Sequence, residues 1–299
     1  MEASYSASTL DRTLRLHDQQ IRNGLIKVAS IQKTSRTFSL GVGAQKSGTG
    51  WLYRYLLTFP NVAATPIKEY HVWDALYIEC CRQFLRQPGN LLTPIDKLRS
   101  ALQHSPGLYF DHFIGLLEAS ARELVCDITP SYAGLQRGVL NHIRSKFEDA
   151  DILTKAVFLM RDPIERCWSA SRMGSRNAAG HTQVSSECVL ADAMTDAFEM
   201  RTRYHLTIQE LEAAFAPPNL FLGLYEQLND IAQLRSLSSF CHVGLRPHLL
   251  DSKVNVSPKA QPLDEGVARE IAQHYRAVYE FVAQRMPAAE QLWGGYKYL

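Results

Sequence analysis

A glycine-rich segment with one lysine is the first feature of the sequence that could bind an anion. It reads GVGAQKSGTGWL over residues 41–52, and it separates an apolar stretch that starts at Thr37 from a stretch with helical spacing of bulky residues. In a turn between a strand and a helix, backbone amides and the positive end of the helix can hold a phosphate. Glycines also permit tight turns that bind nothing, because they adopt positive φ at no steric cost. The segment is therefore a candidate phosphate-binding loop.

Two familiar phosphate-binding patterns do not fit this segment. The dinucleotide pattern GxGxxG requires a third glycine where Lys46 stands, and the pattern GxxxxGK[ST] requires a lysine after Gly48, where Thr49 stands. A phosphate bound here would therefore meet a lysine placed two residues before Gly48.

Two further segments contain side chains that could accept a proton or bind a phosphate. In KEYHVWD, residues 68–74, Glu69 and His71 are both possible proton acceptors, and an extended backbone would point them the same way. In KAVFLMRDPIERCWSASRM, residues 155–173, Arg161 follows an apolar strand, and the Asp-Pro pair after it is a typical helix start. Single residues of these types are often solvated or structural. The functional interpretation therefore depends on their combination.

In this order, the three segments resemble the motifs of the sulfotransferases that use 3′-phosphoadenosine-5′-phosphosulfate (PAPS). The motifs are closest to those of the enzymes that modify heparan sulfate and related glycans: QKSGT, then KE-x-H, then a strand ending in Arg-Asp-Pro with Ser169 eight residues after the arginine. Weaker similarity is found in DITPSY, residues 127–132, and in LGLYEQL, residues 222–228, so the resemblance covers about residues 38–260. The sequence departs from the pattern at Gly50, where many family members carry a second threonine.

The resemblance implies a role for each of these residues. PAPS would be the sulfuryl donor, a hydroxyl group of a carbohydrate-like, lipid or small-molecule acceptor would attack in line, and no metal would take part. Lys46 would be the catalytic cation beside the transferred group, Glu69 would be the general base, and His71 is the rival base. The residues that the resemblance implies in donor binding are Lys46, Ser47, Gly48, Thr49, Gly50, Trp51, Arg161 and Ser169.

Two other functions stay open. A P-loop kinase that uses ATP and magnesium could hold the metal through Asp127 at the end of an apolar strand. We expect a structural or acceptor-side role for Asp127 instead, because no lysine follows Gly48 to anchor the phosphates of ATP. A catalytically inactive nucleotide-binding scaffold is the second alternative. Candidate contacts to the acceptor are Lys68, Tyr132 and residues 172–181. Residues 253–259 resemble a loop that can close over the nucleotide.

Alternating apolar stretches and helical patterns predict the elements that position these residues. They indicate an α/β fold, a mainly parallel sheet with helices on both faces, which the resemblance identifies as a P-loop-like sulfotransferase fold. Residues 174–186 are expected to form a long loop. Strands are predicted at 38–42, 62–65, 124–129, 155–161 and 219–225, and helices at 49–59, from 73, at 134–146, from 162 and at 267–286.

Composition limits the class of protein. The 299 residues, of which 46% are hydrophobic and 21% charged, predict a single folded domain over residues 37–299 after a helical or flexible extension over residues 1–36. A net charge of +2 gives no reason to expect nucleic acid or a membrane as partner. Neither an apolar run of about 18 residues nor an apolar N-terminal stretch is present, so we expect a cytoplasmic protein with no transmembrane segment. Cys126 and Cys167 are expected to be reduced, buried thiols.

Overall fold

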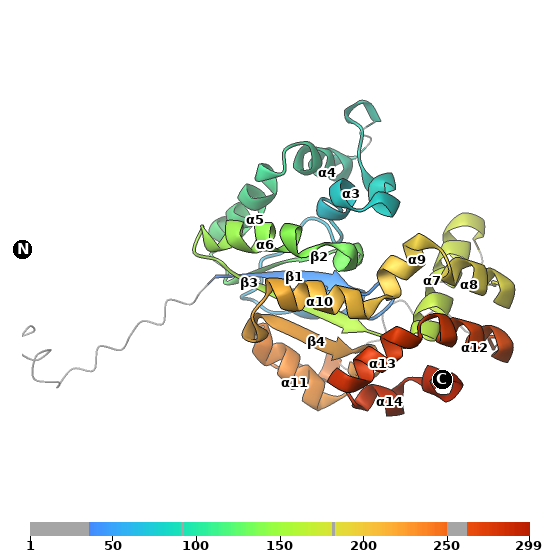
Figure 1. Cartoon of the computed structure of the whole chain (residues 1–299). Helices are drawn as coiled ribbons and strands as arrows, with labels where there is room; N and C mark the ends of the chain where they lie inside the picture. The colour runs from blue at the N-terminus through green and yellow to red at the C-terminus, as the bar shows by residue number, and fades with distance from the viewer. Residues whose placement is uncertain (1–35, 91–92, 181–182, 250–261) are drawn as a thin grey trace, which may run out of the picture. The chain divides into compact units, whose positions relative to one another are not determined.

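A computed structural model describes residues 36–90, 93–180, 183–249 and 262–299 of the chain (Figure 1). Its four strands form one parallel sheet in the order β2-β1-β3-β4. Each strand lies where a continuous apolar stretch predicts it, because both faces of the sheet are covered. The strands are β1 (Thr37–Gly43), β2 (Leu124–Ile128), β3 (Leu153–Met160) and β4 (Leu220–Leu224).

Alternate residues of the strands enter two separate hydrophobic clusters, one on each face of the sheet. Phe38 and Leu40 of β1 and Phe158 of β3 belong to the larger cluster, whereas Val157 and Leu159 of β3 belong to the smaller one. Because side chains of a strand alternate between its two faces, this division confirms the predicted sheet with helices on both sides.

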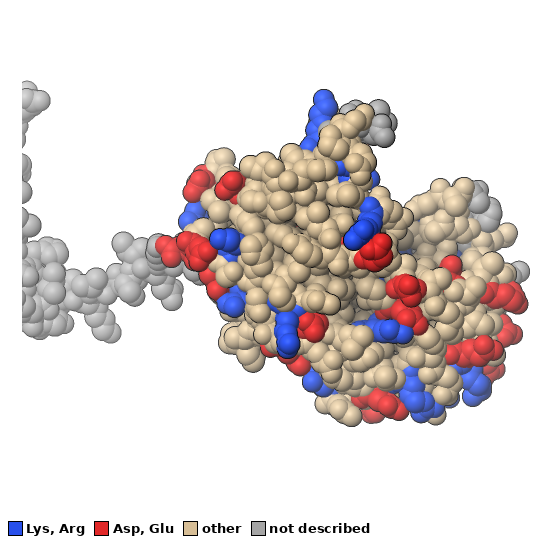
Figure 2. All heavy atoms as spheres, turned by 45° about the horizontal axis from the view of Figure 1, so that its top comes forward, with Lys and Arg blue, Asp and Glu red and all other residues tan. Residues whose placement is uncertain are grey.

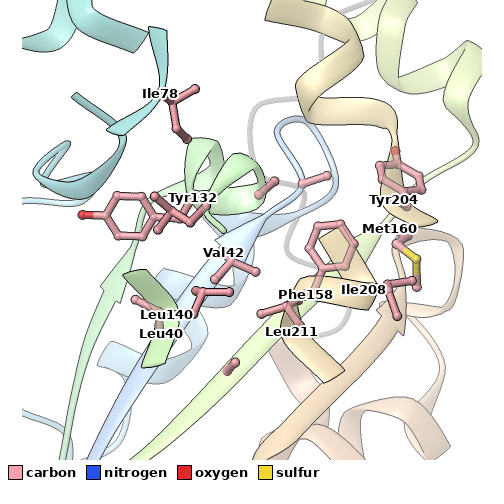
Figure 3. Packing of buried hydrophobic residues seen from close by; sticks show 14 of the residues in the cluster. Leu40, Val42, Ile78, Tyr132, Leu140, Phe158, Met160, Tyr204, Ile208 and Leu211 are labelled. Carbon is pink, nitrogen blue, oxygen red and sulfur yellow. The ribbon is translucent and has the colours of Figure 1, made fainter. Parts of the chain in front are cut away.

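The helices divide between the two clusters. Figure 3 shows side chains of α10 pointing toward β3, where the rings of Tyr204 and Phe158 meet edge to face at 5.7 Å. The larger cluster receives side chains from α5 (Gly107–Ser120), α6 (Arg137–Glu148), α10 (Tyr204–Ala214), α12 (Glu265–His274) and α13 (Arg276–Arg285). The smaller cluster receives them from α2 (Thr49–Leu57) and α11 (Ile231–Phe240).

The remaining elements surround the carboxyl ends of the strands or connect the larger helices, and Figure 1 shows α7, α8 and α9 grouped together. The further α-helices are α3 (Trp73–Tyr77), α4 (Pro94–His104), α7 (Pro163–Ala179), α8 (Ser186–Ala193), α9 (Asp196–Thr202) and α14 (Ala288–Leu292). Short 3₁₀ helices are η1 (Glu79–Phe84), η2 (Pro88–Asn90), η3 (Pro130–Gly134), η4 (Pro217–Asn219), η5 (Tyr225–Gln227), η6 (Pro247–Leu249) and η7 (Gly294–Tyr298).

Three of the predicted elements are wrong in kind or extent. The strand predicted at 62–65 is reduced to one bridge between Val62 and Leu124, since Pro66 follows and has no N–H to donate. The long loop predicted at 174–186 is mostly helix, because α7 continues to residue 179 and ends at Gly180 in the left-handed conformation with φ 75°. A glycine inside a helix, as at Gly174, costs only about 1 kcal/mol relative to alanine and does not stop it.

The helix predicted at 267–286 is two helices. A turn at Tyr275 separates α12 from α13, and the Tyr275 hydroxyl donates a hydrogen bond to the carbonyl oxygen of Ala193. Helical periodicity continues across the break, so the sequence pattern alone does not reveal it.

Residues Arg36–Leu299 form a compact unit. The predicted extension over residues 1–36 lies, apart from Arg36, outside the described residues, and so does the loop at 253–259. Cys126 and Cys167 are fully buried, as predicted. Among the described residues, none of the helices combines the length and the apolar character that crossing a bilayer requires.

Candidate active site

The glycine-rich segment forms a tight turn between β1 and α2 at the carboxyl edge of the sheet. Gly48 precedes α2 with φ 89°, and no side chain caps the first turn of this helix. A Cβ atom on residue 48 would lie 2.3 Å from Cδ1 of Leu228, so both the backbone conformation and the available space require glycine there. The uncapped amides of the first turn are the groups with which a helix binds an anion.

Lys46 lies in this turn, in the left-handed conformation with φ 70°. Burial first, and nearby guanidinium groups second, together lower the pKa of its ammonium group to about 8, although the carboxylate of Glu69 opposes them. The contact of its Nζ within the described part of the chain is to Sδ of Met173 at 3.8 Å. Lys46 is thus a half-buried cation among other cations, which are Arg176, Arg161 and Arg172. This arrangement favours a bound anion.

Arg161 follows β3 directly and lies beside the same turn. Its Nη1 donates to the carbonyl oxygen of Lys46 at 3.2 Å, its Nη2 pairs with Glu165 at 3.0 Å, and its guanidinium lies 4.4 Å from the centre of the Tyr225 ring. Ser169 lies two turns into α7. The Arg-Asp-Pro motif therefore brings a guanidinium and a hydroxyl to the lysine of the turn.

The carboxylate of Asp162, the next residue, joins the C-terminal part of the chain to the start of α7 through hydrogen bonds. Its Oδ1 accepts hydrogen bonds from the N–H of Ile164 at 3.0 Å and the hydroxyl of Tyr279 at 2.6 Å, and its Oδ2 accepts one from the N–H of Gly295 at 2.9 Å. Glu226 accepts a bond from the N–H of Asp162 at 3.1 Å. The position of the residue after Arg161 thus depends on three elements further along the chain, η5, α13 and η7.

A cavity of about 1100 Å³ joins these groups to the KEYHVWD segment. Ser47 differs from the other predicted site residues, because it is fully buried and its hydroxyl has no hydrogen-bond partner among the described residues. The predicted site residues that line the cavity are Lys46, Gly48, Thr49, Gly50, Trp51, Glu69, His71, Arg161 and Ser169. On the face shown in Figure 2, by contrast, acidic and basic side chains are interspersed.

Glu69 and His71 are not on an extended segment. Both residues adopt the left-handed conformation, with φ 62° and 54°, a state that costs an ordinary residue about 1–2 kcal/mol. The extended backbone assumed from the sequence is therefore wrong. Their side chains meet nevertheless, with Nε2 of His71 3.6 Å from Oε2 of Glu69. Strained backbone of this kind is typical of functional sites.

A buried carboxylate holds the His71 ring. The Nδ1 atom of His71 lies 2.6 Å from Oδ2 of Asp74, which is fully buried and also accepts a bond from the hydroxyl of Ser131. The ring stacks on Phe84 at 3.9 Å between centroids. Burial alone would lower the pKa of His71, but hydrogen bonds to Asp74 and Glu69 raise it above its ordinary value. Since Nδ1 faces Asp74, Nε2 is the nitrogen directed at Glu69.

Glu69 has two cationic or hydrogen-bonding neighbours. Burial would raise the pKa of its carboxyl group, but the bond to His71 and the adjacent ammonium of Lys68 together lower it to about 2. Lys68 thus pairs with Glu69 instead of pointing elsewhere, although it still lines the cavity. The carboxylate of Glu69 and the ring of His71 thus lie side by side.

The sequence and structure comparisons bear on the fold. No family model and no curated protein matches the sequence. The crystal structure of a sulfotransferase from Alicyclobacillus acidocaldarius aligns with a TM-score of 0.54 and 18% identity, over 84% of this chain and 96% of that chain. The chain has a sulfotransferase fold. The sulfotransferase domain of the olefin synthase of Synechococcus aligns with a TM-score of 0.43 and 14% identity, over 80% of this chain and 94% of that one.

In this sulfotransferase fold, the strained segment is held by hydroxyl groups. The N–H of Tyr70 donates to Oγ1 of Thr129 at 3.0 Å, and the N–H of Val72 donates to the hydroxyl of Tyr132 at 3.3 Å. Both hydroxyls donate in turn to the carboxylate of Asp127, at 2.6 and 3.0 Å. The two amides that flank His71 are thus fixed through relays that end on one carboxylate.

Of the structural or acceptor-side role expected for Asp127, its contacts support the structural one. It is fully buried, and Tyr109 donates a third hydrogen bond to it at 2.8 Å. Burial raises its pKa to about 6, although the three hydroxyl donors lower it. Tyr132 is buried beside it, so the interpretation of Tyr132 as an acceptor contact is wrong. Residue 181, part of the other proposed acceptor contact, lies outside the described residues.

Sequence reasoning missed two residues of the sulfotransferase-fold site, Asp74 and Arg201. The spacing of Asp74 three residues after His71 is one helical turn, which was a usable signal. Arg201, on α9, lines the cavity but lies about 130 residues after His71 in the sequence and belongs to no motif. Within the described ranges, no group of three or more histidine, cysteine, aspartate or glutamate side chains is arranged to hold a metal ion.

Proposed function

We propose that this protein is a sulfotransferase that moves a sulfuryl group from PAPS to a hydroxyl group of an acceptor. The observation that carries the proposal is the state of Lys46, an ammonium group without a carboxylate ion pair in the described part of the chain, in a cavity with the uncapped start of α2. A group of cations this crowded is stable when an anion occupies it. PAPS supplies phosphates and a sulfuryl group together.

The residues suit the two ends of this donor. The amides from Gly48 to Trp51 and the hydroxyl of Thr49 would bind the 5′-phosphate, while Arg161 and Ser169 would bind the 3′-phosphate. The hydroxyl of Ser47, which has no partner among the described residues, would be a further donor. Arg161 now shares its guanidinium with a carbonyl oxygen and Glu165, which leaves further N–H groups for a phosphate.

The reaction follows from these positions. The acceptor oxygen forms a bond to sulfur while the bond from sulfur to the 5′-phosphate oxygen breaks, and the electron pair leaves with that phosphate. Lys46 would stabilise the charge that develops on the leaving oxygen. The acceptor proton passes to Glu69 or His71, whose side chains lie 3.6 Å apart. We keep Glu69 and His71 as the two candidate bases.

The kinase and the inactive-scaffold alternatives have less support. Asp127, the candidate magnesium ligand of a kinase, is occupied by three hydroxyl donors and is not among the described residues that line the cavity. An inactive scaffold would not need the strained, ionised arrangement at Glu69 and His71, which costs stability and contributes nothing to a fold.

Thermal unfolding with nucleotides tests the donor. We expect 3′-phosphoadenosine 5′-phosphate (PAP) to raise the melting temperature, while ATP with magnesium gives a smaller rise, because Arg161 and Ser169 address a phosphate that ATP lacks. Arg161→Ala is the matched variant and should remove most of the difference between the two nucleotides. Equal stabilisation by ATP, or a strict need for magnesium, would favour the kinase. Transfer of label from ³⁵S-labelled PAPS to hydroxyl compounds then tests the reaction itself.

A further inference from the structure

One buried cation of the cavity has no role in the proposed transfer. Arg201 is 6% exposed and lines the cavity. Its Nη1 donates to the carbonyl oxygen of Ala197 at 2.7 Å, its Nη2 donates to Sγ of Cys81 at 3.4 Å, and its Nε has no partner among the described residues. No carboxylate in the described ranges lies within the 4.0 Å that defines an ion pair with this guanidinium. A buried charge without a counter-charge costs several kcal/mol.

The thiol beside Arg201 does not balance its charge. Burial raises the pKa of Cys81 to about 12, even though Arg201 lowers it, so this thiol is neutral at physiological pH. Two other cations of the cavity have a carboxylate partner, since Arg161 pairs with Glu165 and Lys68 pairs with Glu69. Lys46, which has no such partner in the described part of the chain, lies in the turn before α2 and has a role in the proposed transfer.

Arg201 belongs to the side of the cavity that holds the proton acceptors. Its helix α9 packs against η1 and η3. Phe84 of η1 stacks on the His71 ring, and Ser131 of η3 donates to Asp74 behind it, and both residues line the cavity. A hydroxyl group that loses its proton to the Glu69–His71 pair therefore belongs to a molecule that lies along this wall.

Given the sulfotransferase function proposed above, on which this inference rests, we infer that the acceptor carries an anionic group, a carboxylate, sulfate or phosphate ester, which Arg201 binds beside the hydroxyl that is sulfated. The planar guanidinium, held from behind by Ala197 and Cys81, is oriented in advance for such a group. Arg201 is then a specificity-determining residue. It selects acidic hydroxyl compounds over neutral ones of the same shape.

Inorganic sulfate is the probe that tests this site without knowledge of the acceptor. The protein is first saturated with PAP, and its melting temperature is then followed against sodium sulfate, with sodium chloride at equal ionic strength as the reference. The variants are Arg201→Gln and Arg203→Gln. Arg203→Gln is the matched control, because it removes the same charge two residues away from Arg201. The side chain of Arg203 is 45% exposed and pairs with Glu199 outside the cavity.

We expect sulfate to stabilise the wild type and Arg203→Gln, and to bind Arg201→Gln about ten- to a hundredfold more weakly, which is the usual loss for a charge-assisted hydrogen bond. Arg201→Lys, which keeps the charge but not the fork, should lie between them, and it replaces Arg201→Gln if the latter does not fold. A wild-type response that Arg201→Gln retains in full would overturn the inference, since the sulfate would then be bound beside Lys46. So would a wild type that does not respond to sulfate.

The same titration separates this inference from the proposed function. A wild type that PAP does not stabilise would refute the proposed donor, whatever sulfate does. A normal response to PAP in Arg201→Gln together with an unchanged response to sulfate would refute only the role of Arg201.

Discussion

The lowered pKa of Lys46 makes donor binding depend on pH. At a pKa of about 8, the ammonium group is about nine-tenths charged at pH 7 and about one-tenth charged at pH 9 in the ligand-free protein. A bound phosphate returns the pKa toward 10.5, so binding takes up a proton at high pH. The affinity for PAP is therefore full below pH 8 and falls as pH rises through 8, by about tenfold or 1.4 kcal/mol between pH 7 and pH 9.

Isothermal titration calorimetry of PAP in buffers of different ionisation enthalpy measures both quantities. We expect about 0.9 proton taken up per PAP at pH 9 and about 0.1 at pH 7, together with the tenfold loss of affinity. The phosphate groups of PAP do not contribute at pH 9, because their second pKa of about 6 leaves them fully ionised there, whereas about one-tenth of each is still protonated at pH 7. The uptake at pH 9 is therefore the value that reports on Lys46.

Lys46→Arg is the matched variant for this measurement. Arginine remains charged at both pH values, so PAP binding should lose its pH dependence while affinity at pH 7 stays within a few-fold of the wild type. The reasoning fails if the wild type takes up no proton at pH 9, or if Lys46→Arg keeps the same dependence. The titrating group would then be another one.

Three further predictions concern the other residues of the site. Arg161→Ala should raise KM for PAPS about ten- to a hundredfold with kcat less affected, because the contact of Arg161 with the donor exists in the ground state and the transition state alike. Steady-state kinetics measures both constants. An unchanged KM in a folded variant would remove Arg161 from the site. Whichever of Glu69→Gln and His71→Ala removes the base should lower kcat about 10²- to 10⁴-fold at unchanged PAP affinity. If His71 is the base, kcat of the wild type rises with pH through a pKa above 6.5, whereas a flat profile from pH 5 to 8 assigns the role to Glu69. The folded-state pKa of Asp127 is about 6, above the ordinary 3.8, so the folded state binds the proton of this carboxyl group more tightly than the unfolded state does. The free energy of unfolding therefore falls by up to about 3 kcal/mol as pH rises from 4 to 7. Urea unfolding should show this loss of stability in the wild type and not in Asp127→Asn. The prediction is wrong if the free energy of unfolding changes with pH in the same way in both proteins.

The sheet and its turn could be predicted from the sequence because each depends on local pattern. Strands buried on both faces are continuous apolar stretches, and a glycine such as Gly48 is required by its own backbone and a close neighbour. The predictions of a strand at 62–65 and of a single closing helix were wrong because both depend on hydrogen bonds that residue periodicity does not contain. Pro66 has no N–H to donate, and the turn at Tyr275 carries a hydrogen bond from its hydroxyl to Ala193.

Glu69 and His71 were named from the sequence as candidate bases, but their backbone geometry was not predicted. The left-handed backbone at Glu69 and His71 is stabilised by Thr129 and Tyr132, which are about 60 residues further along the chain. Arg201 was missed for the same reason, since its position in the cavity follows from packing of α9 and not from spacing.

The hydrogen bonds to Asp162 also set an order of events during synthesis. Arg161 and Ser169 leave the ribosome more than 100 residues before Gly295, which supplies one of the bonds that fix Asp162 beside them. The sheet can form on a growing chain, since the four strands of the described residues precede residue 225. The hydrogen bond from Gly295 to Asp162 can form only after η7 has emerged. A nascent chain would thus form the sheet first and complete the contacts beside Arg161 last.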